Sequence, residues 1–146
     1  AGRRVRELQK LGLLDDSPVH DAARTLLDLV ARTLFPSRAE GGAAVVVVGS
    51  RDQLGWGTRP ERAAEAAAVF ATVRSLALQL APHGVTVNLV AGLPAADGPA
   101  ALLPEPATAG DLAATAAFLA HPRSRYITGQ VVFCDAGAAL LSSFSV

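Results

Sequence analysis

Tyrosine, lysine, cysteine and histidine, four residue types that often serve in catalysis or metal binding, are rare in this chain. The 146 residues include one tyrosine, Tyr126, one lysine, Lys10, and one cysteine, Cys134. A single cysteine excludes an internal disulfide and a cysteine-based metal cluster. The histidines have no mutual spacing typical of a metal site, and we expect all three to be structural. They are His20, His83 and His121. Proton transfer by Tyr126 is therefore the first chemistry to test. The position of Tyr126 in the fold decides whether it can act as a proton donor.

The first half of the chain predicts a helix, a strand and a second helix. Apolar residues recur at helical spacing over residues 21–35, and Pro36 ends that helix. The run "AAVVVVGS" at 43–50 has no polar face, so we expect a strand buried on both sides, as in a parallel sheet. Residues 61–80 are apolar on nearly all sides and predict a long helix that other elements must cover.

The second half predicts a strand, a helix and a last strand. The strands are "VTVNLVA" at 85–91 and "GQVVFCDAG" at 129–137, and the helix spans 111–120 with Thr108 as a possible cap. Strands that alternate with helices call for parallel strands joined by right-handed crossovers. Three strands leave two sheet edges, so we expect further chain or a partner to cover them.

Composition limits the partners. The formal net charge is zero and no basic stripe is visible, which argues against nucleic-acid binding. The longest apolar run without charge or proline is too short to cross a bilayer, so we expect no membrane partner. The N-terminus "AGRRVRELQK" is charged from Arg3 onward and lacks an apolar core segment, so we expect no signal peptide. These observations predict a cytoplasmic protein.

Three stretches resemble the C-terminal half of the short-chain dehydrogenases/reductases. They are "VVVVGS" at 45–50, "RSLALQLAPHGVTVNLVA" at 74–91 and "AATAAFLAHPRSRYITGQVVFCDAG" at 113–137. The 3-oxoacyl-acyl carrier protein reductase branch is the most similar. The resemblance implies an α/β fold, namely a truncated Rossmann-like parallel sheet of about three strands with flanking helices. It implies a single domain over residues 1–146, with the N-terminal cofactor-binding half of the family absent.

The resemblance also implies where the family's catalytic residues would fall. Those enzymes move a hydride between NAD(P)H and a carbonyl carbon, with a tyrosine as proton donor and a lysine that lowers its pKa. The tyrosine position falls on Arg62, the lysine position on Ala66 and the asparagine position on about Ala23. Only the serine is retained, as Ser50. Tyr126 matches a structural tyrosine at the turn into the last strand, so we do not expect it to be the catalytic acid.

The sequence also departs from the family at the positions that bind the cofactor. The family holds the pyrophosphate with a glycine-rich turn, and no G-x-x-x-G-x-G pattern occurs here. Where the family has Pro-Gly beside the nicotinamide, this chain has "AGLP" at 91–94. We therefore expect no cofactor to be bound by this chain alone. NAD(P)H would be bound by a partner chain or by an N-terminal half outside these residues.

Several single residues allow both a functional and a structural interpretation. Ser50 is either a residual substrate-polarising hydroxyl or ordinary turn chemistry at a strand end. Arg62 either binds a phosphate of an acyl carrier or is a solvated side chain at a helix start. Trp56 is either a partner anchor or a plug in the vacated cleft. Cys134 is expected to be a small core residue.

Two function hypotheses follow from these residues. In the first, the chain is a catalytically degenerate reductase-like subunit that stabilises or regulates an intact NAD(P)H-dependent ketoreductase. Helices 21–35 and 61–80 would form the interface with that reductase or with a second copy. The last strand and its tail resemble the family's second association surface.

In the second hypothesis the chain belongs to an active NAD(P)H-dependent oxidoreductase whose cofactor half lies outside these residues. Arg62 is a poor replacement for the tyrosine, because a guanidinium stays protonated near neutral pH. A weaker alternative is a small-molecule or acyl-chain binding module that uses the old cleft beside Ser50 and Trp56.

Overall fold

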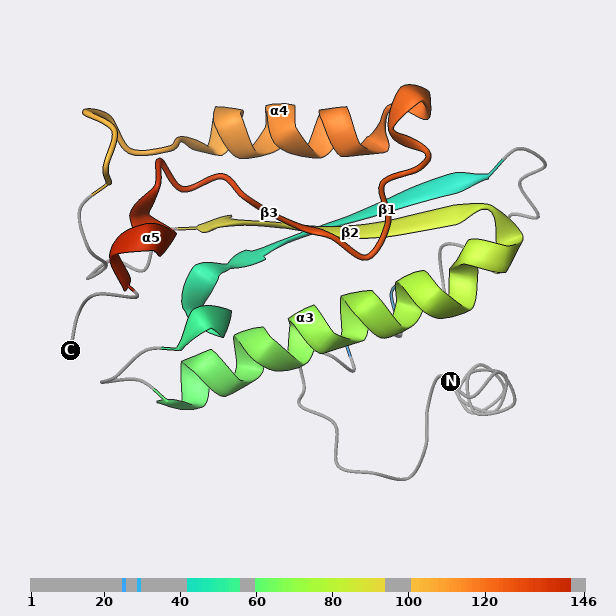
Figure 1. The fold of residues 1–146 in the computed structure, drawn as a ribbon, viewed down its shortest axis with the longest axis horizontal. Coiled ribbons are helices and arrows are strands. Elements are labelled where there is room, and N and C mark those ends of the chain that lie inside the picture. Colours follow the sequence, from blue (N-terminus) through green and yellow to red (C-terminus); the bar gives the residue numbers. More distant parts are fainter. Residues whose placement is uncertain (1–24, 26–28, 30–41, 56–59, 94–100, 143–146) are drawn as a thin grey trace.

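The centre of the protein is a small parallel sheet. The computed structural model describes residues 25, 29, 42–55, 60–93 and 101–142. Its strands are β1 (Ala43–Ser50), β2 (Val85–Leu93) and β3 (Val131–Phe133), in the order β1-β2-β3 with every pair parallel (Figure 1). The predicted α/β fold with a short parallel sheet is confirmed. Because β2 has a neighbour on both sides, it is the buried centre of the sheet.

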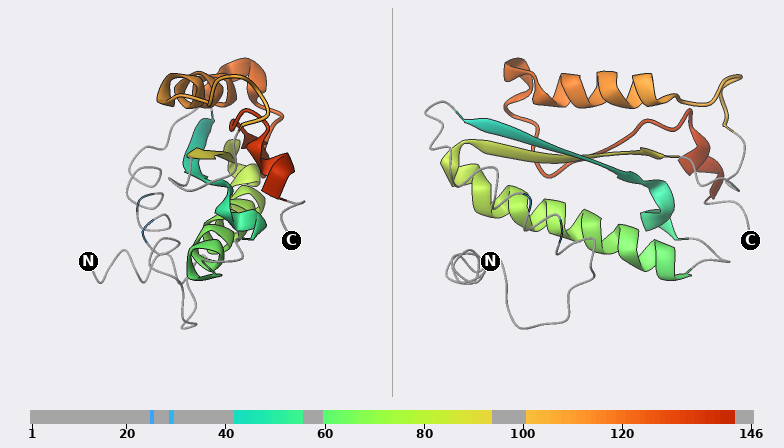
Figure 2. Two further views of the ribbon diagram at one scale, coloured as in Figure 1. Left: turned by 90° about the vertical axis from the view of Figure 1, so that its left-hand side faces the viewer. Right: turned by 180° about the vertical axis from the view of Figure 1, so that it is seen from behind.

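One long helix covers each face of the sheet. α3 (Pro60–Leu80) lies below the sheet and α4 (Ala109–Ala120) lies above it (Figures 1 and 2). Successive side chains of β2 point to opposite faces. Leu89 therefore joins the core against α3, and Val90 joins the core against α4. The alternation divides the interior into two apolar layers, one on each side of the sheet.

α3 packs on the sheet through one face. Val73, Leu76, Ala77 and Leu80 are buried on that face, at the spacing of a helical stripe. By length and composition alone, the 24 residues Pro60–His83 could cross a membrane. The sequence did not predict such a segment. Only 22% of its apolar part is buried, so the contacts of α3 with the sheet cover one face of the helix alone.

A buried asparagine fixes the approach to β3. The Asn88 side chain, which is fully buried, donates to the carbonyl of Ile127 at 2.8 Å and accepts from the amide of Gln130 at 3.0 Å. The Thr128 hydroxyl oxygen accepts from the amide of Val87 at 3.1 Å. These bonds hold the turn that carries Tyr126 against β2, and they satisfy polar groups that would otherwise be costly to bury.

Two expectations differ from the structure, and a third is mostly outside the described residues. β3 covers only 131–133 of the predicted 129–137, since the chain turns at Asp135 into a short helix, α5 (Ala138–Ser142), that the sequence did not predict. β1 is only half-buried, because β2 is its one strand neighbour among the described residues, and Val48 stays 46% exposed. The predicted helix 21–35 lies outside the described residues except for Thr25 and Leu29, which are both helical.

Candidate functional site

The candidate site starts where β1 ends. The register of the β1–β2 pair shifts between Gly49 and Ser50, which turns the chain away from the sheet. Ser50 then caps a short 3-10 helix, η1 (Arg51–Leu54), and its hydroxyl oxygen accepts from the Asp52 amide at 3.1 Å. This capping bond supports the interpretation of Ser50 as turn chemistry. It leaves the hydroxyl proton of Ser50 available to a second group.

A cavity of about 500 Å³ lies beside this turn. Its walls come from the second half of β1, from Asp52 in η1, from the first half of α3, from Leu89, and from Thr25 and Leu29. The volume is in the range typical of small-molecule sites. The α3 positions that line it are spaced as one helical face. They are Arg62, Glu65, Ala66 and Val69.

Two ion pairs surround η1. The Arg62 guanidinium lies 3.6 Å from Asp52 Oδ2, and the Arg51 guanidinium lies 3.9 Å from Asp135 Oδ2. Arg51, Asp52 and Asp135 are buried, whereas half of the Arg62 side chain is exposed. Asp135 also accepts from the amides of Gly137 and Ala139, so it caps α5. These contacts tie the ends of β1 and β3 to the start of α3.

The polar groups of η1 are incompletely paired. Arg51 Nε, Asp52 Oδ1 and Gln53 Oε1 are buried and have no hydrogen-bond partner. Leaving such groups unpaired is unfavourable, and each requires an explanation in a folded protein. The unpaired oxygen of Asp52 is important here because Asp52 borders the cavity.

The structure brings together the positions that the resemblance assigned to catalysis. Ser50, Arg62 and Ala66 all line the same cavity. Tyr126 lies elsewhere, on the turn before β3, where the residue is 85% exposed and the Arg125 guanidinium lies 5.0 Å from the ring centroid. Ala23 lies outside the described residues.

The other residues singled out from the sequence either stabilise a turn or the core, or lie outside the described residues. His121 Nδ1 accepts from the Arg123 amide and so begins a short turn, and His83 is exposed. Cys134 is half-buried against the α4 core, as expected of a small core residue. Within the described ranges no group of three metal-ligating side chains occurs. Trp56 and His20 lie outside those ranges.

The two long helices described here offer no site for the pyrophosphate of a nicotinamide dinucleotide. A pyrophosphate needs free backbone amides at a helix N-terminus. α3 begins with Pro60 and Glu61, a residue without an amide proton and a negative charge. The N-terminus of α4 is closed by a capping box between Thr108 and Asp111. We therefore assign no step of any reaction to a cofactor held by these elements.

Sequence analysis did not single out Asp52 and Glu65, although both line the cavity. A signal for Glu65 was present, since Arg62, Glu65 and Ala66 share one helical face. The sequence indicated less about Asp52, because an aspartate two residues after a capping serine is common in exposed turns and does not point to a binding site. Its burial depends on α3 and on the cavity wall, which the local sequence does not encode.

Comparisons with known proteins agree with the fold. No protein-family model matches the chain. The hydroxy(phenyl)methyl-succinyl-CoA dehydrogenase subunit BbsC of Thauera aromatica is 33% identical over 79% of this chain and 51% of its own length. The short-chain reductase NovJ of Streptomyces niveus is 35% identical over 48% of this chain and 35% of its own length.

A solved structure gives the same result. The enoyl-acyl-carrier-protein reductase (NADH) of Aquifex aeolicus VF5 is 30% identical over 80% of this chain and 47% of its own, with a TM-score of 0.65. This chain is similar to short-chain dehydrogenases/reductases and shares their fold over most of its length. The chain spans about half the length of BbsC and of a second curated relative. The cavity beside Ser50, with Arg62 and Ala66 on its wall, is thus a site in a chain that shares the fold of these reductases.

Proposed function

We propose that this chain is a catalytically degenerate short-chain dehydrogenase/reductase-like subunit. It pairs with an intact NAD(P)H-dependent ketoreductase and stabilises or regulates it, and the partner supplies the cofactor site, the tyrosine and the lysine. The cavity carries this proposal, because Arg62 and Ala66 stand on its wall at the positions that the resemblance gives to the catalytic pair. Neither residue can donate a proton near neutral pH, since a guanidinium stays protonated and alanine has no acidic group.

The outer face of α3 supports an association role. Ala64, Ala71, Ser75 and Leu78 are exposed and follow one stripe of the helix, and Leu78 is 80% exposed. Small side chains let a second helix approach closely, and an exposed leucine beside them is typical of an interface. Together with helix 21–35, this stripe would form the interface with a reductase or with a second copy.

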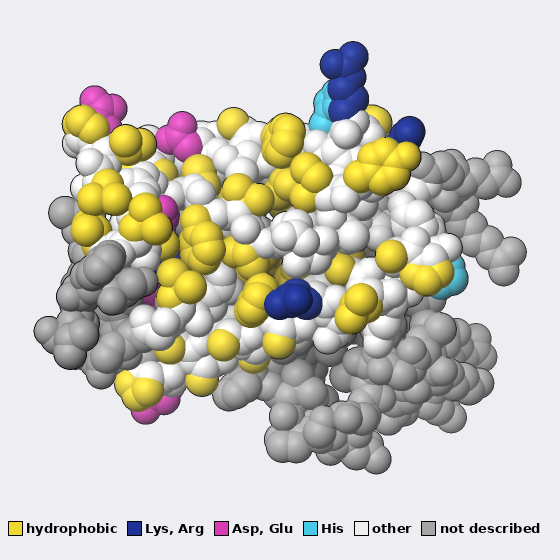
Figure 3. Space-filling view, in the orientation of Figure 1, with side chains coloured by type: hydrophobic (Ala, Val, Ile, Leu, Met, Phe, Trp, Pro, Cys, Tyr) yellow, Lys and Arg dark blue, Asp and Glu magenta, His cyan; other side chains and the backbone are white. Residues whose placement is uncertain are grey.

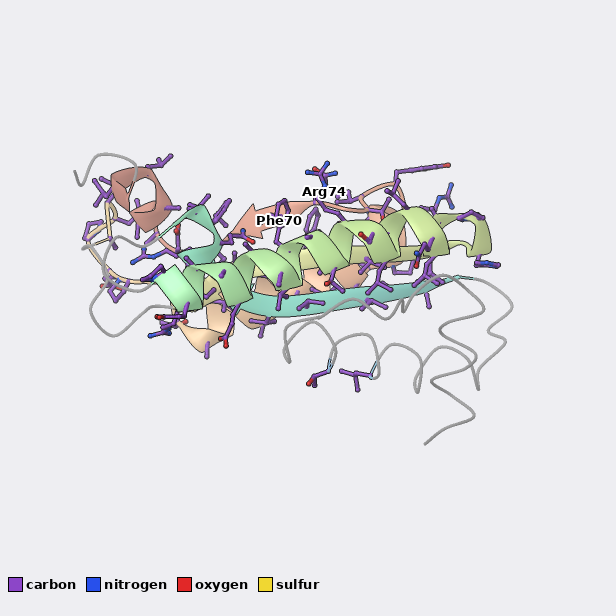
Figure 4. The ribbon with its side chains drawn as sticks, turned by 90° about the horizontal axis from the view of Figure 1, so that it is seen from below. Phe70 and Arg74 are labelled. Carbon is purple, nitrogen blue, oxygen red and sulfur yellow. The ribbon has the colours of Figure 1, made fainter. Side chains whose placement is uncertain are left out.

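Neighbouring features extend this surface. The Arg74 guanidinium lies 5.6 Å from the centre of the Phe70 ring, and Figure 4 shows the two side chains next to each other along α3. Hydrophobic side chains also gather over the face of the molecule between α3 and α4 (Figure 3). Phe133 at the end of β3 and Leu140 in α5 are exposed. The edge of β3 and its tail would be a second association surface.

The name of one relative supports assembly with a second, different chain. BbsC of Thauera aromatica is described as a subunit of a dehydrogenase, and this chain is 33% identical to it. We therefore favour a heteromer over a homodimer. As further parts of the proposal, the assembly is cytoplasmic and binds neither nucleic acid nor membrane.

The test is native mass spectrometry of the protein purified from its own source, followed by assays of the complex. We expect a second, heavier chain that carries the tyrosine, the lysine and the glycine-rich turn. Replacing the partner's catalytic tyrosine should abolish NAD(P)H oxidation, whereas Ser50→Ala in this chain should leave it within about twofold. Turnover of NAD(P)H by this chain alone, lost in Ser50→Ala, would refute the proposal.

A second candidate function is an NAD(P)H-dependent oxidoreductase in which this chain is one half. The observation that favours it is that the chain spans about half of relatives named as a dehydrogenase subunit and a reductase. A chain mass well above 14.9 kDa in the native source, together with NAD(P)H binding, would support this alternative. A 14.9 kDa chain that travels with a complete reductase would exclude it.

A further inference from the structure

The cavity beside Ser50 has a negative charge at one end. Its described ionisable residues are two carboxylates, Asp52 and Glu65, and one guanidinium, Arg62. The net charge of this wall is therefore one negative unit. Arg62 pairs with Asp52 only at 3.6 Å, which is longer than a good hydrogen bond, and no ion pair joins it to Glu65 among the described contacts. A cationic ligand group is favoured at this end over an anionic one.

The rest of the wall is apolar. Val47, Val48, Val69 and Leu89 line it, together with Ala66, whose methyl group leaves room that a longer side chain would occupy. Such walls bury a hydrocarbon skeleton, while a few polar groups at one end fix its orientation. The cavity thus suits a molecule with one charged end and one apolar end.

An unpaired oxygen indicates which polar group is missing. Asp52 is 3% exposed, and its Oδ1 has no hydrogen-bond partner. A carboxylate oxygen accepts hydrogen bonds only, so its missing partner is a donor. The Arg62 guanidinium pairs with the other oxygen, Oδ2, and half of its side chain is exposed. Because Oδ1 is buried, a ligand donor reaches it only after the side chains around Asp52 shift. A metal ion fits less well, because the described residues offer no group of three ligating side chains.

We propose that this cavity binds a small amphipathic amine, with its ammonium group between Asp52 and Glu65 and its apolar skeleton against Val47, Val69 and Leu89. The ammonium supplies the donor that Asp52 Oδ1 lacks and neutralises the net negative charge. This site requires neither catalysis nor a partner chain, so it goes beyond the proposed function. Binding of the amine and failure of the reductase pairing are therefore distinguishable results.

The test compares three probes of nearly the same shape on the 146-residue chain. Phenethylamine is a cation, 2-phenylethanol is neutral and 3-phenylpropionate is an anion. Titration calorimetry, with NMR shifts of the cavity-lining residues, measures the Kd of each. We expect phenethylamine to bind about tenfold or more tightly than 2-phenylethanol, and 3-phenylpropionate to bind most weakly. Equal binding of all three, or a preference for the anion, would overturn the proposal.

Two variants and one control locate the ammonium. Glu65→Gln removes an exposed carboxylate at the cavity, so it should fold normally and weaken phenethylamine binding about fivefold to tenfold. Asp52→Asn tests the buried oxygen, provided that thermal denaturation shows a folded variant. Glu61→Gln is the matched control, because Glu61 is an exposed acid on the same helix that does not line the cavity. If Glu65→Gln changes the Kd no more than Glu61→Gln does, the site is not where we place it.

Discussion

At Gly92 the backbone of β2 passes very close to the chain that follows β3. A Cβ atom at Gly92 would collide with the carbonyl oxygen of Cys134 and would lie 2.9 Å from its carbonyl carbon. The adjoining Cys134 amide donates to Ala91 at 2.9 Å, so neither strand can move away without losing a bond. Only glycine allows the two backbones this approach.

Gly92→Ala should therefore lower the free energy of unfolding by about 1–3 kcal/mol or more, as overpacked sites do. Urea denaturation measures the change. Gly110→Ala is the control, because a Cβ there would lie 3.5 Å from its nearest neighbour and alanine favours a helix. That variant should be neutral or more stable, and an equal loss in both variants would contradict the argument.

Ala136 has a backbone angle that alanine rarely adopts. Its φ is +54°, in the left-handed region, on the turn between Asp135 and α5. The side chain makes this conformation unfavourable by about 1–2 kcal/mol, and glycine avoids that strain at some entropic cost. Ala136→Gly should raise the free energy of unfolding by about 0.5–1 kcal/mol. Ala114→Gly in exposed α4 should instead lower it by about 1 kcal/mol, which denaturation of both variants will check.

At the scale of the element, the start of α4 depends on one reciprocal cap. The Asp111 amide donates to the Thr108 hydroxyl oxygen at 3.3 Å, and that hydroxyl and the Thr108 amide donate to Asp111 Oδ2 at 2.6 Å and 2.8 Å. The predicted cap at Thr108 is confirmed, and the structure adds its partner. Thr108→Ala should lower the free energy of unfolding by about 1 kcal/mol, measured by urea denaturation.

The same cap makes α4 sensitive to acid. The hydrogen bond from the Thr108 side chain, followed by that from its amide, lowers the pKa of Asp111 below the ordinary 3.8. Because the folded pKa lies below the unfolded one, the carboxylate stabilises α4 fully above about pH 4. That stabilisation is lost as the pH falls below 3.8 through the folded pKa. Comparing urea midpoints between pH 2 and 6 should show a smaller acid loss in Asp111→Asn, and an unchanged loss would contradict this.

At the scale of the whole molecule, the exposed stripe of α3 decides how the chain associates. Leu78 is 80% exposed, so Leu78→Glu should leave the stability of the isolated chain within about 0.5 kcal/mol. A charge in the centre of an interface should weaken association by about 2 kcal/mol or more, about 30-fold. Native mass spectrometry and size-exclusion chromatography of the complex measure this loss.

Phe118→Glu is the control for that variant. Phe118 is 58% exposed and lies on α4, which covers the other face of the sheet from α3 (Figure 1). Its variant should keep the complex intact. Equal loss of the complex in both variants would mean that general surface hydrophobicity, and not the α3 stripe, holds the assembly together.

The order and the parallel arrangement of the elements could be predicted from the sequence. β-branched runs such as 43–50 and the long apolar helix near 61–80 depend on neighbours within a few residues, and local patterns record those neighbours. The sequence also determined that Arg62 and Ala66 occupy the positions that the resemblance gives to the catalytic pair, because residue identity does not depend on packing.

Only the tertiary structure decided where these residues meet. The local sequence around Asp52 and Glu65 does not place them together, yet the end of β1 and the start of α3 bring both to one cavity with Ser50. The shortening of β3 and the helix α5 follow from Asp135, whose carboxylate accepts from two later amides and lies near Arg51 of another element. Burial, pairing and cavity shape arise from contacts between distant segments, and no local pattern contains them.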